Sequence, residues 1–343
     1  MLVSNRSDPI LVLACRLGDM KLLLLGGTRF LGRAIAVEAL ARGMEVTCLA
    51  RGTSAPPDGV TFVRADRNDD IALSPVSQQH WDAVIDVSMQ PGQVRRAVRD
   101  LSTDHVVIIS TSSVYATGDR LEQDEDAPIL AALDGDIMTD MSTYGPAKVA
   151  CEEAVRASTV TSTIIRSGLI GGPGDTSGRS GYYPWRFAHP TGEDVLVPDD
   201  PDFPCALIDV DDLAAWAVTA AQNRIAGTFN ATGPTTPLAN VLETARRVAG
   251  EQAPPPQPVP VEILRAAGVQ SWMGPKSLPL WIDDPADRYG ATADTRAARA
   301  FGLTTRPLEE TLARALEYEE RRDTPRRAGL SDADEQQLRG LLA

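Results

Sequence analysis

A tyrosine and a lysine four residues apart have the clearest capacity for chemistry in this sequence. Tyr144 and Lys148 fall in a stretch that predicts a helix from about residue 143 to residue 156, and residues four apart on a helix share one face. An unperturbed tyrosine titrates at about pH 10, so it needs a nearby cation before it can exchange protons at neutral pH. An ammonium group one turn away supplies that charge. The pair predicts a general acid/base, with an exposed surface pair as the alternative.

The composition supports a special role for this lysine. The chain holds 33 basic residues, and only three of them are lysines. An arginine-rich sequence that keeps lysine at this position indicates that a compact ammonium group is required there. A segment rich in hydroxyl groups, residues 110–113, lies upstream at the end of a predicted strand.

A glycine-rich loop near the start of the chain predicts a phosphate-binding site. It lies between four consecutive leucines, expected to form a buried strand, and a helix that ends at Gly43. Free N–H groups and the helix dipole favour an anion there, and glycine lets the backbone approach a pyrophosphate closely. The alternative is a turn that only packs a helix on a strand. The predicted dinucleotide-binding residues of this loop are Gly26, Gly27, Thr28, Arg29, Phe30, Leu31 and Gly32.

The residues that follow the second predicted strand bear on which dinucleotide binds. NAD sites commonly place an acidic residue there, whereas NADP sites supply cations. Arg51 occupies this place, and Arg29 stands where such loops usually carry a third glycine. The two guanidinium groups together favour NADP, with NAD as the alternative if both arginines are solvated surface residues. Asp66 and Arg67, after the third strand, are expected to contact the adenine.

These residues need an α/β framework that brings strand ends together. The pattern predicts a doubly wound parallel Rossmann-like sheet with a smaller C-terminal substrate lobe. The expected strands are 21–25, 44–50, 60–65, 82–87, 105–110 and 161–166. We expect four regions. Residues 1–19 form a disordered extension, or are an artefact of an upstream start codon, and residues 20–166 form an NAD(P)-binding domain. Residues 167–320 form a substrate lobe interleaved with returning Rossmann elements, and residues 321–343 form a peripheral charged tail.

Composition and charge limit the classes of partner that we expect this protein to bind. A net charge of −14 argues against a nucleic-acid partner, because phosphates would be repelled. The four cysteines show no paired spacing, and there are three histidines without a Cys/His cluster. These features predict free thiols in a reducing compartment and no metal site. The apolar run 10–15 is too short to span a membrane. We therefore expect a cytoplasmic protein with a small-molecule substrate.

As an ordered set, these motifs resemble the extended, epimerase/dehydratase-type branch of the short-chain dehydrogenase/reductase superfamily. The similar segments within residues 20–320 are 26–32, 110–115, Tyr144 with Lys148, 208–213 and 227–230. The resemblance implies that Thr111 hydrogen-bonds the substrate oxygen, with Ser112 as its substitute. Tyr144 would be the general acid/base and Lys148 would bind the nicotinamide ribose.

The resemblance also bears on assembly and on substrate contacts. Members of the superfamily often dimerise through a helix bundle, so a homodimer is compatible with it. Ser113 is a further candidate for substrate contact. Trp185 and Arg186, within the aromatic segment 182–187, are candidates as well, with a place in the core as the alternative, because aromatic clusters commonly form part of a core.

Two departures from the family pattern narrow the expected function. Sugar-nucleotide 4,6-dehydratases of this branch carry an Asp-Glu pair after the threonine, whereas this chain has Ser112 and Ser113, which disfavours dehydration. The loop with Arg29 is similar to that of an atypical subgroup that includes chloroplast stem-loop RNA-binding proteins, but those proteins lack the Tyr-Lys pair. We predict an NADP(H)-dependent oxidoreductase, of reductase or epimerase type, acting on a carbonyl or alcohol centre of a small metabolite, with sugar- or nucleotide-linked compounds among the options. The alternatives are a non-catalytic NADP(H)-binding regulatory protein and a stem-loop RNA-binding protein.

Overall fold

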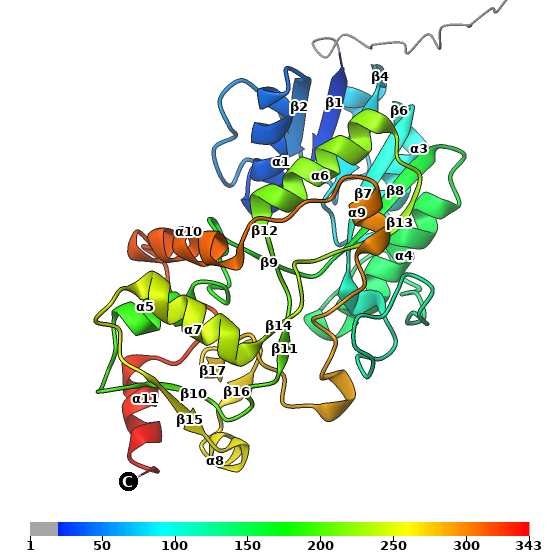
Figure 1. Cartoon of the computed structure of the whole chain (residues 1–343). Helices are drawn as coiled ribbons and strands as arrows, with labels where there is room; N and C mark the ends of the chain where they lie inside the picture. The colour runs from blue at the N-terminus through cyan, green and yellow to red at the C-terminus, as the bar shows by residue number, and fades with distance from the viewer. Residues whose placement is uncertain (1–19, 343) are drawn as a thin grey trace, which may run out of the picture.

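A seven-stranded parallel sheet forms the larger part of the protein, and a smaller lobe lies at the carboxyl ends of its strands (Figure 1). The computed structural model describes residues 20–342. The strand order is β13-β8-β7-β5-β1-β2-β3, and all neighbours pair in parallel. The strands are β1 (Lys21–Leu25), β2 (Glu45–Ala50), β3 (Thr61–Arg64), β5 (Ala83–Asp86), β7 (His105–Thr111), β8 (Thr161–Ser167) and β13 (Gly227–Ala231). The predicted doubly wound fold is confirmed.

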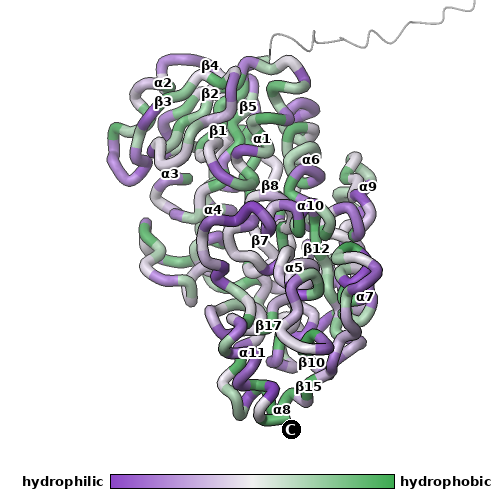
Figure 2. The backbone as a smooth tube through the Cα atoms, turned by 90° about the vertical axis from the view of Figure 1, so that its left-hand side faces the viewer, coloured by the Kyte–Doolittle hydropathy of each residue, from purple (hydrophilic) through white to green (hydrophobic). Residues whose placement is uncertain are grey.

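The four leucines of β1 show why this sheet is covered on both faces. Successive side chains of a strand point to opposite faces, and Leu22 and Leu24 belong to one hydrophobic cluster while Leu23 and Leu25 belong to another. In Figure 2 the strands around β1 are mainly green, which marks hydrophobic residues. Helices α1 (Phe30–Ala41) and α6 (Val210–Asn223) cover one face, and α3 (Pro91–Asp100) and α4 (Tyr144–Arg156) cover the other.

Short elements connect the strands of this sheet. Helix α2 (Ser74–Ser77) precedes a two-strand pair of β4 (His80–Trp81) with β6 (Ser102–Thr103). Two 3-10 turns, η1 (Ser112–Val114) and η2 (Met141–Thr143), lie between β7 and α4. The second of them leads directly into α4 and so sets where that helix begins.

The lobe has a hydrophobic core of its own, built from side chains between Leu169 and Leu338. The chain returns from the lobe to the sheet through α6, β13 and α9 (Arg296–Ala300). The lobe helices are α5 (Tyr182–Ala188), α7 (Leu238–Ala249), α8 (Val261–Ala266), α10 (Leu308–Glu320) and α11 (Asp332–Arg339), with a 3-10 turn η3 (Pro285–Asp287). Its strand pairs are β9 (Leu169–Gly171) with β12 (Leu207–Asp209), β10 (Val195–Pro198) with β15 (Pro256–Val259), β11 (Pro204–Cys205) with β14 (Thr236–Pro237), and β16 (Gln270–Ser271) with β17 (Ser277–Leu278).

The segment expected to be a peripheral charged tail packs into the lobe instead. Leu330 and Leu338 are buried in the lobe core. A capping box of Ser331 and Asp334 starts α11, where two otherwise unpaired backbone N–H groups are satisfied. Although this segment carries many charged residues, the burial of Leu330 and Leu338 attaches it to the lobe.

Three further expectations concern the cysteines, the N-terminal extension and membrane-spanning segments. Cys48, Cys151 and Cys205 are buried free thiols. Cys15 and the extension over 1–19 lie outside the described residues. None of the helices between residues 20 and 342 combines the length and the apolar character needed to cross a membrane.

Candidate active site

The glycine loop makes a tight connection between β1 and α1. Gly26 has a φ of +111°, which favours glycine, and a Cβ on Gly32 would lie 2.2 Å from the carbonyl oxygen of Gly26. No side chain caps the start of α1, and its first turn holds no acidic residue. The N–H groups of this turn are therefore open to an anion.

A cavity of about 330 Å³ lies beside this loop, at the carboxyl ends of β1, β2, β3 and β5. Arg29 donates from Nε to Ser54 Oγ at 2.8 Å, which joins the glycine loop to the segment after β2. Arg51 is exposed at the same edge, while Gly27, Phe30, Leu31 and Gly32 form the adjoining turn. The structure thus brings the expected cofactor residues to one groove, whose lining includes Gly26, Thr28, Arg29, Arg51, Asp66 and Arg67.

Arg67 reaches this groove as one half of a buried ion pair. Its Nη1 and Nη2 lie 2.7 and 2.9 Å from the two carboxylate oxygens of Asp86. Burial alone would raise the pKa of Asp86, but the charge of Arg67 and the hydrogen bonds from Arg67 and Ser88 bring that pKa below its usual value. The guanidinium of Arg67 is therefore bound to the end of β5, whereas Asp66 is exposed.

Tyr144 and Lys148 lie on the first two turns of α4. Lys148 is 2% exposed, and its Nζ donates to the carbonyl oxygens of Ser88 at 2.6 Å and Ile109 at 2.5 Å. These carbonyls lie just beyond β5 and near the end of β7, so the lysine is attached to the carboxyl edge of the sheet. An ammonium group has three donors, which leaves one for a ligand. Tyr144 is partly exposed one turn earlier.

The hydroxyl-rich segment at the end of β7 divides into a buried and an open part. Thr111 is buried, and its Oγ1 accepts the N–H of Ser113 at 3.2 Å and donates to Ser113 Oγ at 3.2 Å. Ser112 and Ser113 line a cavity of about 290 Å³. A Cβ on Gly145 would lie 2.2 Å from the carbonyl oxygen of Ser113. The first turn of α4 is therefore packed directly on this segment.

A buried network under the site was not identified from the sequence. Arg166 of β8 donates to both carboxylate oxygens of Glu152, at 3.1 and 2.9 Å, and Ser110 Oγ donates to Glu152 at 2.5 Å. Burial raises the pKa of Glu152, but Arg166 and Ser110 lower it below its usual value. The sequence does contain a sign of this network, because Glu152 follows Lys148 at the same four-residue interval that separates Lys148 from Tyr144.

Trp185 and Arg186 are not brought to this site. Arg186 is buried in the lobe, where it donates to the carbonyl oxygen of Leu330 at 2.9 Å and to Asp332 at 2.7 Å. Trp185 lines a separate cavity with His189 and Arg326. The sequence offered no means of telling a ligand-binding arginine from one that would pair with a helix near the C-terminus.

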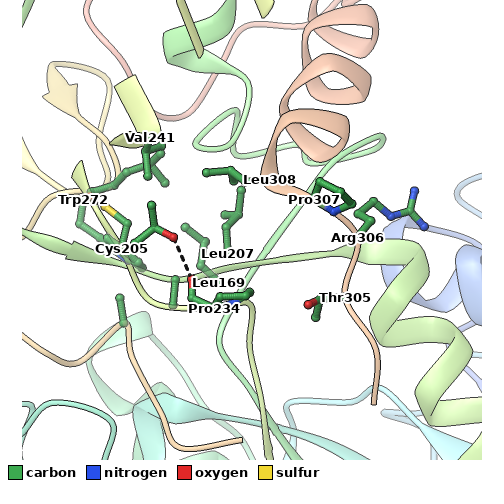
Figure 3. Close-up of a pocket in the computed structure, with 14 residues that line it drawn as sticks. Leu169, Cys205, Leu207, Pro234, Val241, Trp272, Thr305, Arg306, Pro307 and Leu308 are labelled. Atoms are coloured by element: carbon green, nitrogen blue, oxygen red, sulfur yellow. Dashed lines mark hydrogen bonds between the residues drawn. The ribbon is translucent and has the colours of Figure 1, made fainter. Parts of the chain in front are cut away.

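A further cavity of about 360 Å³ adjoins the one that Ser112 and Ser113 line, and the two share Leu169, Trp272 and Ala291. Figure 3 shows its wall, built mainly from apolar side chains of β9, the strands of the lobe and the start of α10. This space lies where the sheet edge meets the lobe.

Comparisons with known proteins agree with this architecture. The model of the NAD dependent epimerase/dehydratase family matches residues 22–100 and 91–231, more than half of the chain. No curated protein sequence gives a match.

Several solved structures share the fold. A protein of Burkholderia cenocepacia J2315 is 21% identical, with a TM-score of 0.67 over 88% of this chain and 99% of that chain. The UDP-glucose 4-epimerase of Thermotoga maritima, solved with UDP-glucose, is 17% identical, with a TM-score of 0.63 over 88% and 99%. The enzyme WbmG of Bordetella bronchiseptica, solved with NAD and UDP, is 16% identical, with a TM-score of 0.65 over 88% and 96%. On the strength of the family match, this chain belongs to the NAD dependent epimerase/dehydratase family of enzymes.

Proposed function

We propose that this protein is an NADP(H)-dependent oxidoreductase, of reductase or epimerase type, that acts on a carbonyl or alcohol centre of a small metabolite. The observation that carries the proposal is the attachment of Lys148 to the ends of β5 and β7, one turn from Tyr144. The end of β5, with Ser88, lines the groove formed by the glycine loop. A proton-transfer group and a dinucleotide site therefore meet at one edge of the sheet.

The groove fits a dinucleotide, because the loop turns tightly and leaves its backbone open to a phosphate. A Cβ at Gly32 would collide with the carbonyl oxygen of Gly26 in this turn. The preference for NADP rests on the residues after β2. Arg29 and Arg51 line the groove there, and the sequence from residue 50 to residue 54 holds no acid. Two guanidinium groups suit a 2′-phosphate, whereas a carboxylate would suit the free ribose hydroxyls of NAD.

The residues of the chain divide the chemistry among them. A nicotinamide held in the groove would supply or accept the hydride. The Tyr144 hydroxyl gives a proton to the substrate oxygen during reduction, or removes one during oxidation. Ser112, which faces the cavity, donates a hydrogen bond to the same oxygen, and Thr111 orders the turn that presents it. Lys148 keeps one donor for a ribose hydroxyl.

Replacing the proton carrier tests this proposal. Tyr144→Phe should lower NADPH-dependent turnover by roughly 10²- to 10⁴-fold, the usual contribution of general acid/base catalysis, while NADPH binding stays unchanged. Turnover is measured as NADPH oxidation with a panel of aldehydes and ketones, using the best wild-type substrate. Tyr318→Phe, on α10, is the matched control.

The same assay separates the alternatives. An epimerase interconverts its substrate without net consumption of NADPH, whereas a reductase consumes one equivalent for each turnover. Full activity of Tyr144→Phe would contradict the proposed role. A wild-type protein that binds NADPH but neither reduces a carbonyl substrate nor interconverts epimers would favour a non-catalytic NADP(H)-binding protein.

A further inference from the structure

A loop of the lobe lies against the cofactor groove. It runs from Gly171 to Gly181, between β9 and α5. A Cβ on Gly174 would lie 3.2 Å from the ring of Phe30, so the loop lies against the glycine loop of the cofactor groove. Arg179 is near its end. The position of this loop places an arginine side chain between the groove and the lobe.

The loop is internally ordered by an aspartate that is not paired with this arginine. Asp175 is buried, and it accepts hydrogen bonds from the N–H groups of Ser177 and Ser180, at 2.9 and 3.1 Å, and from their hydroxyls, at 2.5 and 2.9 Å. Four donors from the loop itself satisfy this carboxylate. Its side chain therefore holds the shape of the loop and leaves the guanidinium of Arg179 to other partners.

Arg179 lies over the indole ring of Trp272, with Cζ 4.8 Å from the ring centroid. Within residues 20–342, the guanidinium makes one side-chain hydrogen bond, from Nε to Ser177 Oγ at 3.2 Å. Burial lowers the pKa of Arg179, while electrostatic interactions with Asp175 and Tyr144 act to raise it. A cation withdrawn from water needs a counter-charge, and the described part of the chain provides no carboxylate within salt-bridge distance.

Trp272 connects this arginine to both cavities. Its side chain lines the cavity of Ser112 and Ser113 and also the larger one beside it. Its backbone has a φ of +65°, and Leu280, in the wall of the larger cavity, has a φ of +64°. Left-handed backbone at bulky residues is strained and is found preferentially where a ligand is held. The indole thus lies in the wall of both cavities, and the Arg179 guanidinium lies over that indole, close enough to Tyr144 for the two groups to interact electrostatically.

The larger cavity is lined almost entirely by uncharged side chains. Among the described residues that line it, Arg306 is the one charged side chain. Its Nε and Nη2 donate to Asp212 at 2.9 and 2.8 Å, and in Figure 3 the guanidinium extends away from the apolar side chains. This charge is already neutralised. The space suits an apolar group and lacks the free cations that a diphosphate would require.

We infer that Arg179 and Trp272 form a substrate subsite for a carboxylate next to the reacting carbonyl or alcohol carbon, with the apolar remainder of the substrate in the larger cavity. The planar fork of a guanidinium matches a carboxylate through two parallel hydrogen bonds. The substrate class is then a small apolar oxo acid or hydroxy acid, as distinct from a nucleoside diphosphate sugar. This inference rests on the proposed function, because it takes Tyr144 as the group that meets the substrate oxygen.

Matched probes test the subsite. Phenylpyruvate carries a phenyl ring, a ketone and a carboxylate, and 1-phenylpropan-2-one has a methyl group in place of the carboxylate. Binding of each, and of UDP-glucose, to the NADP⁺-loaded protein is measured by titration calorimetry. We expect phenylpyruvate to bind about tenfold or more tighter than the neutral ketone, as a charge-assisted bidentate contact should allow. UDP-glucose should bind more weakly than phenylpyruvate.

Variants assign the effect to the arginine. Arg179→Gln should weaken phenylpyruvate binding about 10- to 100-fold, with the affinities for NADP⁺ and the neutral ketone kept. Arg179→Lys should restore part of the loss, because it keeps the charge without the fork. Arg247→Gln, exposed on α7, should behave as the wild type. Unchanged NADP⁺ binding shows that each variant is folded.

The outcomes that overturn the inference are distinct from those that overturn the proposed function. Equal or undetectable binding of the two phenyl probes, an unchanged phenylpyruvate affinity in Arg179→Gln, or tighter binding of UDP-glucose would each reject the subsite. Full turnover by Tyr144→Phe would reject the catalytic role of the tyrosine. In that variant the subsite predicts that phenylpyruvate binding is retained, because Arg179 and Trp272 are untouched.

Discussion

At the scale of single residues, Arg29 shows how an arginine can replace a glycine in a phosphate-binding loop. Its backbone is extended, with φ −137° and ψ 150°, a conformation open to any residue. The strained position is the next one, Phe30, with a φ of 36°. The side chain of Arg29 is directed to Ser54, with 2.8 Å between Nε and Oγ. The substitution therefore adds a cation to the groove without cost to the backbone.

Removing the two arginines should change which cofactor the protein prefers. We expect Arg29→Ala combined with Arg51→Ala to weaken NADPH binding by about 10- to 100-fold, since charge-assisted hydrogen bonds to a 2′-phosphate would be lost. NADH binding should change much less, because NADH lacks that phosphate. Both affinities can be followed by the fluorescence of the reduced nicotinamide. Arg33→Ala, one helical turn away, is the control, and an equal loss for both cofactors would show that neither arginine selects NADP.

At the scale of elements, α4 aligns three side chains against the end of β7. Tyr144, Lys148 and Glu152 follow at intervals of four, so they lie along one face of the helix. Lys148 is bonded to the carbonyl oxygen of Ile109 and Glu152 to the hydroxyl of Ser110. Consecutive residues of β7 thus fix consecutive turns of α4. These two attachments fix the position of α4, and with it Tyr144, relative to the carboxyl edge of the sheet.

The opposite end of β7 carries a histidine that makes stability depend on pH. His105 is fully buried, between Thr161 and Thr163 of β8, with ring nitrogens 2.9 and 2.8 Å from their hydroxyls. Burial, assisted by the charge of Arg224, lowers its pKa to about 4 from 6.5. Below about pH 6.5 the unfolded chain binds a proton that the folded protein does not. The stabilisation is therefore complete above about pH 6.5 and is lost as the pH falls towards 4.

Urea unfolding at about pH 7.5 and pH 5 tests this linkage. For the wild type we expect the histidine to account for a loss of about 1–2 kcal/mol between the two conditions. His105→Gln should lose correspondingly less over the same interval, although it is less stable at the higher pH. His80→Gln, at an exposed position, serves as the control. The same pH dependence in His105→Gln and in the wild type would contradict the assignment.

At the scale of the whole molecule, the C-terminal segment connects the lobe to the loop of Arg179. The backbone N–H groups of Arg327 and Ala328 both donate to the carbonyl oxygen of Ser177 at 3.1 Å. Leu330 and Leu338 then enter the lobe core. The segment that precedes the last helix therefore contacts the loop that carries Arg179. A charged, late segment of the chain is part of the structural frame of the substrate space.

Truncating one buried leucine of this segment should destabilise the lobe. Leu338 is 1% exposed, and Leu338→Ala is expected to lower the free energy of unfolding by about 2–4 kcal/mol through lost burial and the cavity left behind. Leu341→Ala, at a position that is 56% exposed, should change it by less than about 0.5 kcal/mol. Thermal unfolding monitored by circular dichroism gives both values. Equal effects of the two substitutions would show that α11 is peripheral after all.

The sequence by itself determined the features that depend on local geometry. Helical spacing put Tyr144 and Lys148 on one face, and parallel strands bring their carboxyl ends to one edge, so the glycine loop and Arg51 had to meet. Only the tertiary structure decided that Arg67 pairs with Asp86, that Arg186 is buried against α11, and that Arg179 lies on Trp272. The reason is physical: the partner of a long charged side chain is set by how distant segments pack, and no local periodicity encodes that packing.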